Sequence, residues 1–241
     1  MNFETSRVEP TTNSFLNDFL HLFYPQLCLA CQGQLGNAET LICLECKYNL
    51  PKTGFHQVKN NPVSRIFWGR FPFENCSSYL YFEKAADVQQ IMHHIKYRGG
   101  KEVARLVGLW YGEELSQSLG YNDIDMIIPV PLHAEKLKKR GYNQSEWFAM
   151  GLSDGMNIPV NTNCLYRIKN SETQTKKTRF KRWENVSDIF DVKNPEQLKN
   201  KHILLVDDVV TTGATLEACA QTILDLNCGT IISIATLAFA N

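Results

Sequence analysis

Two adjacent carboxylates, Asp207 and Asp208, stand between a run of apolar residues and a short turn rich in hydroxyl groups. The apolar run begins at Ile203 and predicts a buried strand, and the turn opens onto a stretch that predicts a helix. A turn between a strand and a helix offers a phosphate aligned N–H donors and the positive end of the helix dipole. The residues predicted to bind that phosphate are Thr211, Thr212, Gly213, Ala214 and Thr215.

The two acids are expected at the carboxyl end of the strand, where open α/β sheets bind their ligands. Because carboxylates repel phosphate, they are better matched to hydroxyl donors or to a metal ion. A ligand whose phosphate binds the turn and whose hydroxyl groups bind the two carboxylates would be a sugar phosphate. The alternative without a ligand is a buried strand followed by a capped helix.

The segment ILLVDDVVTTGAT, residues 203–215, resembles the phosphoribosyl pyrophosphate (PRPP) signature of the type I phosphoribosyltransferases. The resemblance implies that Asp207 and Asp208 are the catalytic pair and hold the ribose hydroxyls. It also implies that the turn at 211–215 binds the 5′-phosphate, and that Mg²⁺ accompanies the pyrophosphate.

Two basic stretches are candidates for a second anion site, which PRPP requires because it is anionic at both ends. Residues 127–149 begin as a strand and pass through a proline-punctuated turn into a run of lysines and Arg140, and a second basic stretch surrounds Lys96. For residues 127–149, a solvated basic surface is the alternative. The residues predicted to bind pyrophosphate are Lys96, Arg98, Pro129, Val130, Pro131, Leu132 and Arg140.

A third basic stretch, from Arg167 to Arg182, contains seven lysines or arginines and one acid. A segment with so few large apolar residues cannot bury itself, so we expect it to order only over an anion. Closing over a reactive sugar would exclude water, as a lid does. The alternative is a solvated loop that is merely flexible.

Four of the eight cysteines form two Cys-x2-Cys pairs, Cys28 with Cys31 and Cys43 with Cys46, separated by eleven residues. Two such pairs suit a tetrahedral zinc ion held by four thiolates, whose closed coordination makes its role structural. Free or redox-active cysteines are the alternative. The other four cysteines are scattered, and we expect them to be small core residues.

The composition excludes several classes of protein. The formal net charge is zero, so any nucleic-acid or membrane contact must come from a local patch. The first residues lack the pattern of a secretory signal, and no apolar run approaches the roughly 18 residues of a membrane span. A cytoplasmic location is the resulting expectation.

Strand patterns alternate with helix patterns over most of the chain, which predicts an α/β fold with a parallel, doubly wound sheet. The expected strands are 77–84, 126–130, NTNCLYRI, FDV, HILLVDD and IISIATLAFA; the expected helices are 85–99, 101–120, 143–156 and 215–226. The predicted organisation is an N-terminal extension with a short amphipathic helix (1–24), a zinc-ribbon-like four-cysteine module (25–52), a linker or docking segment (53–76) and a phosphoribosyltransferase domain (77–241).

The combination of both cysteine pairs with IKYRGGKEVA, PVPLHAEKLKKRGYNQSE, TQT, RWENV and VDDVVTTGAT resembles the ComF-type (competence protein F) phosphoribosyltransferase family over residues 25–240. The resemblance implies that the turn at 129–132 binds pyrophosphate, flanked by Arg140, Gly141, Asn143 and Gln144. It also implies a flexible loop whose site residues are Thr173, Gln174, Arg179, Arg182 and Asn185.

The predicted function is therefore that of a PRPP-binding phosphoribosyltransferase-like protein that uses Mg²⁺, has an unidentified acceptor and is linked to DNA uptake in competence. One alternative is a PRPP sensor without turnover. The other is a non-catalytic adaptor that contacts single-stranded DNA or proteins of the competence machinery, because a basic loop with Phe180 and Trp183 can stack on bases.

Overall fold

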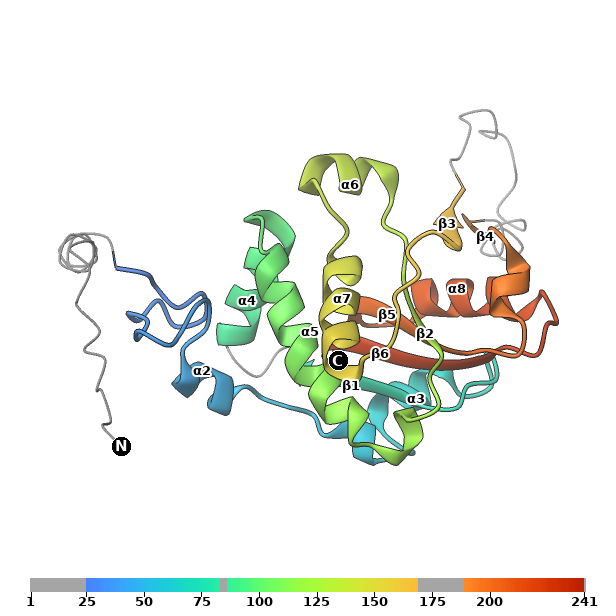
Figure 1. The fold of residues 1–241 in the computed structure, drawn as a ribbon, viewed down its shortest axis with the longest axis horizontal. Helices are drawn as coiled ribbons and strands as arrows, with labels where there is room; N and C mark the ends of the chain where they lie inside the picture. The colour runs from blue at the N-terminus through green and yellow to red at the C-terminus, as the bar shows by residue number, and fades with distance from the viewer. Residues whose placement is uncertain (1–24, 83–85, 169–188, 241) are drawn as a thin grey trace, which may run out of the picture. The chain divides into compact units, whose positions relative to one another are not determined.

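The computed structural model describes residues 25–82, 86–168 and 189–240 (Figure 1). The chain divides into two compact units, Met1–Asn49 and Leu50–Asn241. In the smaller unit the described part contains helix α2 (Leu44–Asn49) and an antiparallel bridge between Leu27 and Gln34. The amphipathic helix expected near the N-terminus lies outside the described residues.

The larger unit is built on a four-stranded sheet in the order β1-β6-β5-β2. Its strands are β1 (Cys76–Tyr81), β2 (Met126–Pro129), β5 (His202–Val210) and β6 (Ile231–Phe239). Each neighbouring pair is parallel. The predicted parallel sheet is thus confirmed. The central strands β5 and β6 read as continuous apolar runs because helices cover both faces of such a sheet.

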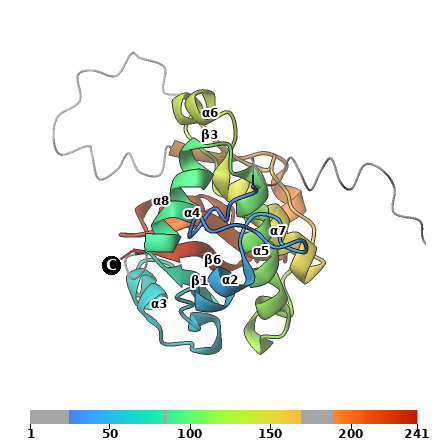
Figure 2. The same ribbon diagram turned by 90° about the vertical axis from the view of Figure 1, so that its left-hand side faces the viewer.

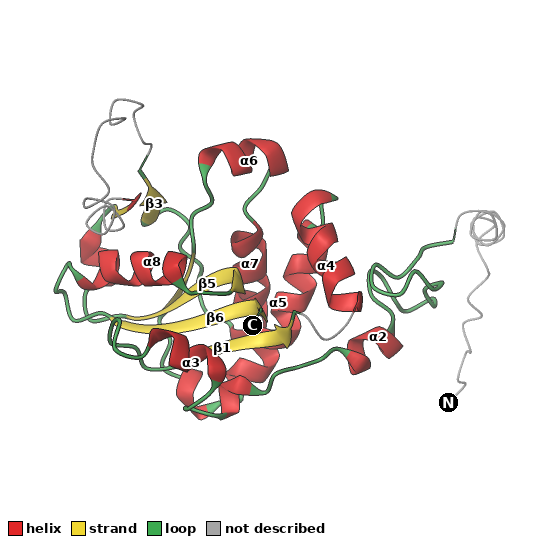
Figure 3. Ribbon diagram, turned by 180° about the vertical axis from the view of Figure 1, so that it is seen from behind, coloured by secondary structure: helices red, strands yellow, loops and turns green. Residues whose placement is uncertain are grey.

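Helices α5 and α7 cover one face of the sheet, and α3 and α8 cover the other (Figures 2 and 3). The α-helices of this unit are α3 (Pro62–Phe67), α4 (Ala86–Tyr97), α5 (Lys101–Ser116), α6 (Ala134–Arg140), α7 (Gln144–Met156) and α8 (Ala214–Leu224). In the part of this unit that the structure describes, the 3-10 helices are η1 (Phe55–Gln57), η2 (Leu119–Tyr121) and η5 (Pro195–Leu198). No helix among the described residues is both long and apolar enough to cross a membrane.

A separate antiparallel pair joins β3 (Leu165–Arg167) to β4 (Phe190–Val192). The sequence predicted both segments as strands, and the structure places them outside the main sheet. Arg167 is opposite Phe190 in this pair, and its guanidinium lies 5.2 Å from the centre of the Phe190 ring. Arg167 is thereby fixed at the end of β3.

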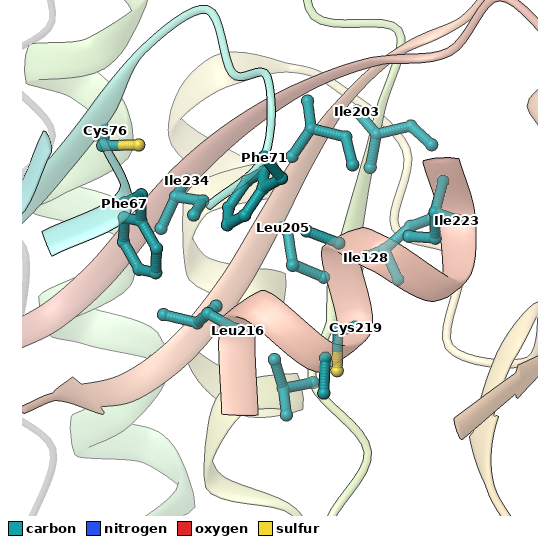
Figure 4. Packing of buried hydrophobic residues seen from close by; sticks show 14 of the residues in the cluster. Phe67, Phe71, Cys76, Ile128, Ile203, Leu205, Leu216, Cys219, Ile223 and Ile234 are labelled. Carbon is teal, nitrogen blue, oxygen red and sulfur yellow. The ribbon is translucent and has the colours of Figure 1, made fainter. Parts of the chain in front are cut away.

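The core beside α3 and α8 includes residues from the segment that the sequence predicted as a linker or docking segment. Phe55, Phe67 and Phe71 are buried there. Figure 4 shows Phe67 and Phe71 beside Ile234 and Leu216, on the side of the sheet covered by α8. The segment at residues 53–76 therefore contributes buried side chains to the core of the larger unit.

Helices α5 and α7 approach each other at glycines. A Cβ atom added at Gly108 would lie 2.3 Å from the Phe148 carbonyl oxygen, and one added at Gly151 would lie 2.0 Å from that of Arg105. A Cβ atom added at Gly112 or at Gly155 would lie 2.6 Å from the facing backbone. The two helix backbones pack directly on each other at these positions, which no other residue type allows.

Three local features differ from the sequence prediction or go beyond it. Helix α5 ends at Ser116 rather than at the expected Gly120, because the chain then turns into η2. The basic run at 136–140, for which the sequence predicted neither a helix nor a strand, lies in α6, which His133 caps by accepting from the Glu135 N–H. His94 is buried on α4, where it lies beside the inward-facing Ile91 and Ile95.

Candidate functional site

Asp207 and Asp208 lie near the carboxyl end of β5, where the strand leaves the apolar core. The strand is fully buried from His202 to Val206 and only partly buried at the two acids. Asp207 remains in register with Thr236 of the neighbouring strand β6. The sheet therefore places both carboxylates at the edge where parallel sheets bind ligands, while their backbone stays rigid.

The Asp207 carboxylate has partners that hold it in place. Its Oδ1 accepts a hydrogen bond from Ser145 Oγ at 2.8 Å and another from the Asp208 N–H at 2.8 Å. Burial, and then the neighbouring Asp208 carboxylate, raise the pKa of Asp207 to about 7. These two effects outweigh the hydrogen bonds and the nearby Lys96 charge, which lower it.

This raised pKa predicts a measurable pH dependence of stability. The folded state holds the Asp207 proton more tightly than the unfolded chain, in which the pKa is near 4, so this group destabilises the fold as the pH rises from about 4 to 7. Asp207→Asn keeps the accepting oxygen but cannot ionise. Between pH 5 and pH 8, we expect the free energy of unfolding of the variant, measured by chemical denaturation, to rise relative to that of wild type by up to about 3 kcal/mol.

The exposed carboxylate Asp225, which follows α8, provides the control for this experiment. Asp225→Asn should change the stability by the same amount at pH 5 and at pH 8. If the unfolding free energies of Asp207→Asn and wild type differed by the same amount throughout this pH range, the raised pKa of Asp207 would be contradicted.

The turn after β5 leads directly into α8. Gly213 is the N-cap of this helix and has φ of +74°. Only glycine adopts this conformation without strain, and it brings the first-turn N–H groups of α8 to the same edge of the sheet as the two acids. The turn thus has the form expected of an anion site at a helix N-terminus.

The second predicted anion turn follows β2, which pairs with β5. The chain continues from Pro129 through residues 130–133 into α6, whose last turn contains Arg140. Asn143 caps α7 by accepting from the Ser145 N–H, and its Nδ2 donates to the Val130 carbonyl oxygen at 3.0 Å. This bond ties the turn to the start of the helix that carries Ser145.

Lys96, near the end of α4, reaches the same place from another part of the chain. Its Nζ lies 3.6 Å from Oδ2 of Asp208. The two side chains are 24% and 18% exposed, so this ion pair is only partly screened by water. Arg98, two residues later, is exposed.

A hollow of about 300 Å³ unites these elements. It is lined by Lys96, Val130, Pro131, Leu132, His133, Lys136, Arg140, Gln144, Ser145, Arg167, Asp207, Asp208, Val209, Thr211 and Thr215. Nine of the fourteen residues predicted as the acid pair, the 5′-phosphate turn and the pyrophosphate site therefore line one cavity. The other five of these are Arg98, Pro129, Thr212, Gly213 and Ala214.

Five residues that line this cavity were not predicted as site residues: His133, Lys136, Ser145, Arg167 and Val209. Ser145 bonds to Asp207 across 62 positions of the sequence, a separation that no local pattern spans. The other four lie in segments that the sequence had already singled out, since Arg167 begins the third basic stretch and Val209 lies in the PRPP-type segment. Only the structure brings these side chains to one hollow.

The five predicted loop residues, Thr173, Gln174, Arg179, Arg182 and Asn185, lie outside the described residues. Ile168 and Ile189 end the described chain on either side of this segment. The roles assigned to those five residues stay predictions.

In the smaller unit the four patterned cysteines come together. Their sulfur atoms all lie within 4.8 Å of one another. Backbone N–H groups point at the sulfurs: that of Cys43 lies 3.3 Å from Cys28 Sγ, and that of Cys46 lies 3.4 Å from Cys43 Sγ. Zinc–thiolate bonds of about 2.3 Å fit within this spacing, so the cluster is compatible with a structural zinc site.

The model of the phosphoribosyl transferase domain family matches residues 113–241, which is more than half of the chain. The chain belongs to the phosphoribosyl transferase domain family. The matched region includes both the turn after β2 and the turn after β5. The fold predicted from the PRPP-type segment is therefore confirmed.

Several proteins of similar length are related to this family member. It is 25% identical to competence protein F of Haemophilus influenzae, with 83% of this chain and 91% of that protein aligned. It is 28% identical to competence protein ComFC of Bacillus subtilis (88% and 83%) and 26% identical to DNA utilization protein YhgH of Escherichia coli K12 (84% and 92%). The predicted ComF-type membership is confirmed by these relatives together with the family model.

Among solved structures, the chain is similar to a glutamine PRPP amidotransferase from B. subtilis complexed with ADP and GMP. The identity is 15% and the TM-score is 0.40, over 60% of this chain and 30% of the other. The aligned part is thus less than a third of that enzyme's length.

Proposed function

We propose that this protein binds PRPP with Mg²⁺ and transfers its phosphoribosyl group to an acceptor. The observation that carries the proposal is the shared cavity, whose lining includes the two carboxylates of β5, Thr211 and Thr215 at the start of α8, and the cations Lys96 and Arg140. Groups that can accept from hydroxyls and groups that can bind an anion thus line one small hollow. This is the charge pattern that a sugar with two anionic ends requires.

In the proposed reaction the bond between ribose C1 and the pyrophosphate oxygen breaks, and the pyrophosphate leaves with the bonding electrons. The acceptor then forms a bond to C1 and loses a proton. Asp207 and Asp208 hold the ribose hydroxyls, and their charge stabilises the electron-poor sugar in the transition state. The turn at 211–215 binds the 5′-phosphate, while Lys96 and Arg140 attract the pyrophosphate.

Carboxylate and phosphate oxygens are the ligands that Mg²⁺ prefers, so the residues of this hollow fit a substrate-bound ion. When bound, the ion supplies positive charge to the leaving pyrophosphate. Asp208 is one carboxylate in the cavity that already pairs with a cation, since its Oδ2 lies 3.6 Å from Lys96 Nζ.

Calorimetric titration of the zinc-loaded protein with PRPP and Mg²⁺ tests this proposal. We expect binding by the wild type and a loss of at least 100-fold in affinity for the Asp207→Asn/Asp208→Asn double variant, because both hydroxyl acceptors lose their charge. Asp225→Asn, on the surface, should bind as the wild type does. Absence of binding by the wild type would contradict the proposal, whereas binding justifies a search for acceptors by pyrophosphate release.

We also propose that the four cysteines bind one structural zinc ion. Elemental analysis should find one zinc per chain in the wild type and none after Cys46→Ser, because three thiolates no longer close the tetrahedral site. Cys228→Ser, at a partly buried position of the other unit, should keep the metal. Equal zinc content in both variants would contradict the assignment.

The names of the relatives favour a role in DNA uptake or utilization, which we propose as the setting of this activity. A non-catalytic DNA or protein adaptor is the second candidate. It predicts salt-sensitive binding of single-stranded DNA that Asp207→Asn/Asp208→Asn leaves unchanged and that neutralising Lys176, Lys177 and Arg179 abolishes.

A further inference from the structure

The turn that leads into α8 is in contact with a segment more than 140 positions earlier in the chain. Arg70 Nη1 donates a hydrogen bond to the Thr212 carbonyl oxygen at 2.8 Å and lies 3.2 Å from Glu217 Oε2. Beside it, Gly213 packs so closely on Phe67 that a Cβ atom there would lie 2.5 Å from the ring. The turn is therefore held from outside by both an apolar and a polar contact.

Arg70 is well placed to hold the turn because its own segment is anchored to the sheet. Helix α3 begins with Asn61, which accepts from the N–H groups of Val63 and Ser64 in a capping box. Asn61 Nδ2 also donates to the carbonyl oxygen of Cys76, at the start of β1. Beyond the helix the Arg70 N–H donates to the Phe67 carbonyl oxygen, which closes the turn that presents the guanidinium.

The hydrogen bond from Arg70 to the Thr212 carbonyl oxygen orients the whole Thr212–Gly213 peptide group. In a trans peptide the C=O and the following N–H point in opposite directions. Holding the Thr212 carbonyl toward Arg70 therefore directs the Gly213 N–H away from Arg70. An N–H at this position, immediately before the first turn of α8, is one of the donors available to an anion.

The charge of Arg70 favours an anion at the same place. A cation beside a helix N-terminus opposes the helix dipole, unless a negative charge lies close to both. Glu217, in the first turn of α8, supplies one such charge on the outer side. A phosphate on the inner side of the turn would supply the second.

We propose that Arg70 is a positioning residue for the 5′-phosphate end of the sugar phosphate site, acting through the Thr212–Gly213 peptide. The inference rests on the proposed function, because it assumes that this turn binds the phosphate of PRPP. It adds to that function a residue outside the cavity and outside the matched domain, which begins at residue 113.

Calorimetry with three probes tests this role: PRPP, ribose 5-phosphate and inorganic pyrophosphate, each with Mg²⁺. We expect Arg70→Ala to weaken the binding of PRPP and of ribose 5-phosphate about 10-fold or more, and to leave that of pyrophosphate unchanged. Arg70→Lys should recover part of the affinity, since an ammonium group can also donate to the carbonyl. Arg65→Ala, on the same segment, removes an exposed arginine bonded to Asn60 and should bind as wild type.

Amide hydrogen exchange of the protein without ligand gives a second readout. The N–H groups of residues 212–214 should exchange faster in Arg70→Ala than in wild type, while those of β5 stay unchanged. Wild-type affinity of Arg70→Ala for ribose 5-phosphate would overturn the Arg70 inference alone. Failure of the wild type to bind either sugar phosphate would overturn the proposed function and this inference together.

Discussion

Replacing Gly151 by alanine is expected to destabilise the larger unit by about 3 kcal/mol or more. The added Cβ would lie 2.0 Å from the Arg105 carbonyl oxygen and 2.7 Å from the Leu109 N atom, both in the backbone of α5. Backbone atoms cannot turn aside as a flexible side chain does, so α5 and α7 must separate and lose packing along their length. Differential scanning calorimetry should show a melting temperature lower by roughly 6–12 °C.

Gly36→Ala, in the smaller unit, is a control for the glycine-to-alanine change itself, because an added Cβ there would lie 3.4 Å from the end of the Glu39 side chain, an ordinary contact. Its melting temperature should stay within about 1 °C of wild type. Because α7 carries Ser145, Gly151→Ala should also weaken PRPP binding by displacing the partner of Asp207. A stability equal to that of wild type would show that the helices are not packed backbone to backbone at this glycine.

The second large effect is expected from Gly213→Ala. Alanine costs about 1 kcal/mol at a φ of +74°, and its Cβ would also lie 2.5 Å from Phe67 and 2.7 Å from Ile66. Since Phe67 is fully buried, the turn rather than the ring must move. We expect a total destabilisation of about 2–4 kcal/mol and a loss of at least 10-fold in PRPP affinity.

Gly54→Ala separates the two causes of this effect. Gly54 has a similar φ of +67°, but nothing lies within 4 Å of an added Cβ, so only the conformational cost of about 1 kcal/mol should be measured. Denaturant titration of both variants gives the difference directly. Equal destabilisation of the two would mean that the contact with Phe67 and Ile66 contributes nothing.

Much of the fold and part of the site could be predicted because the informative residues are contiguous. The strand, the two acids and the turn of residues 203–215 form one local unit, whose backbone follows from the apolar run and from glycine. Helix α4 shows the same kind of local signal: Val88, Ile91, Met92 and Ile95 repeat at helical spacing, and all four are buried. The four cysteines are likewise close in sequence, so their pattern reveals the cluster.

Short helices and the burial of individual polar residues were not predicted from the sequence. The basic run in α6 has no apolar periodicity and no buried residue, so neither pattern nor core contact marks it as a helix. His94 is buried although histidine is often exposed, because it lies on α4 beside the buried Ile91 and Ile95. Such features depend on which other elements pack against a segment, and the local sequence pattern does not specify those neighbours.

The sequence by itself determined the family, the parallel sheet, the acid pair with its turn and the cysteine cluster, because each depends on residues adjacent in the chain. Only the tertiary structure decided which distant groups meet them. Ser145 reaches Asp207, Lys96 reaches Asp208 and Arg70 reaches Thr212, each from another element. Such pairings arise from strand register and helix packing. They determine the charge and the position of the site's side chains, whereas a sequence motif specifies only the residue types.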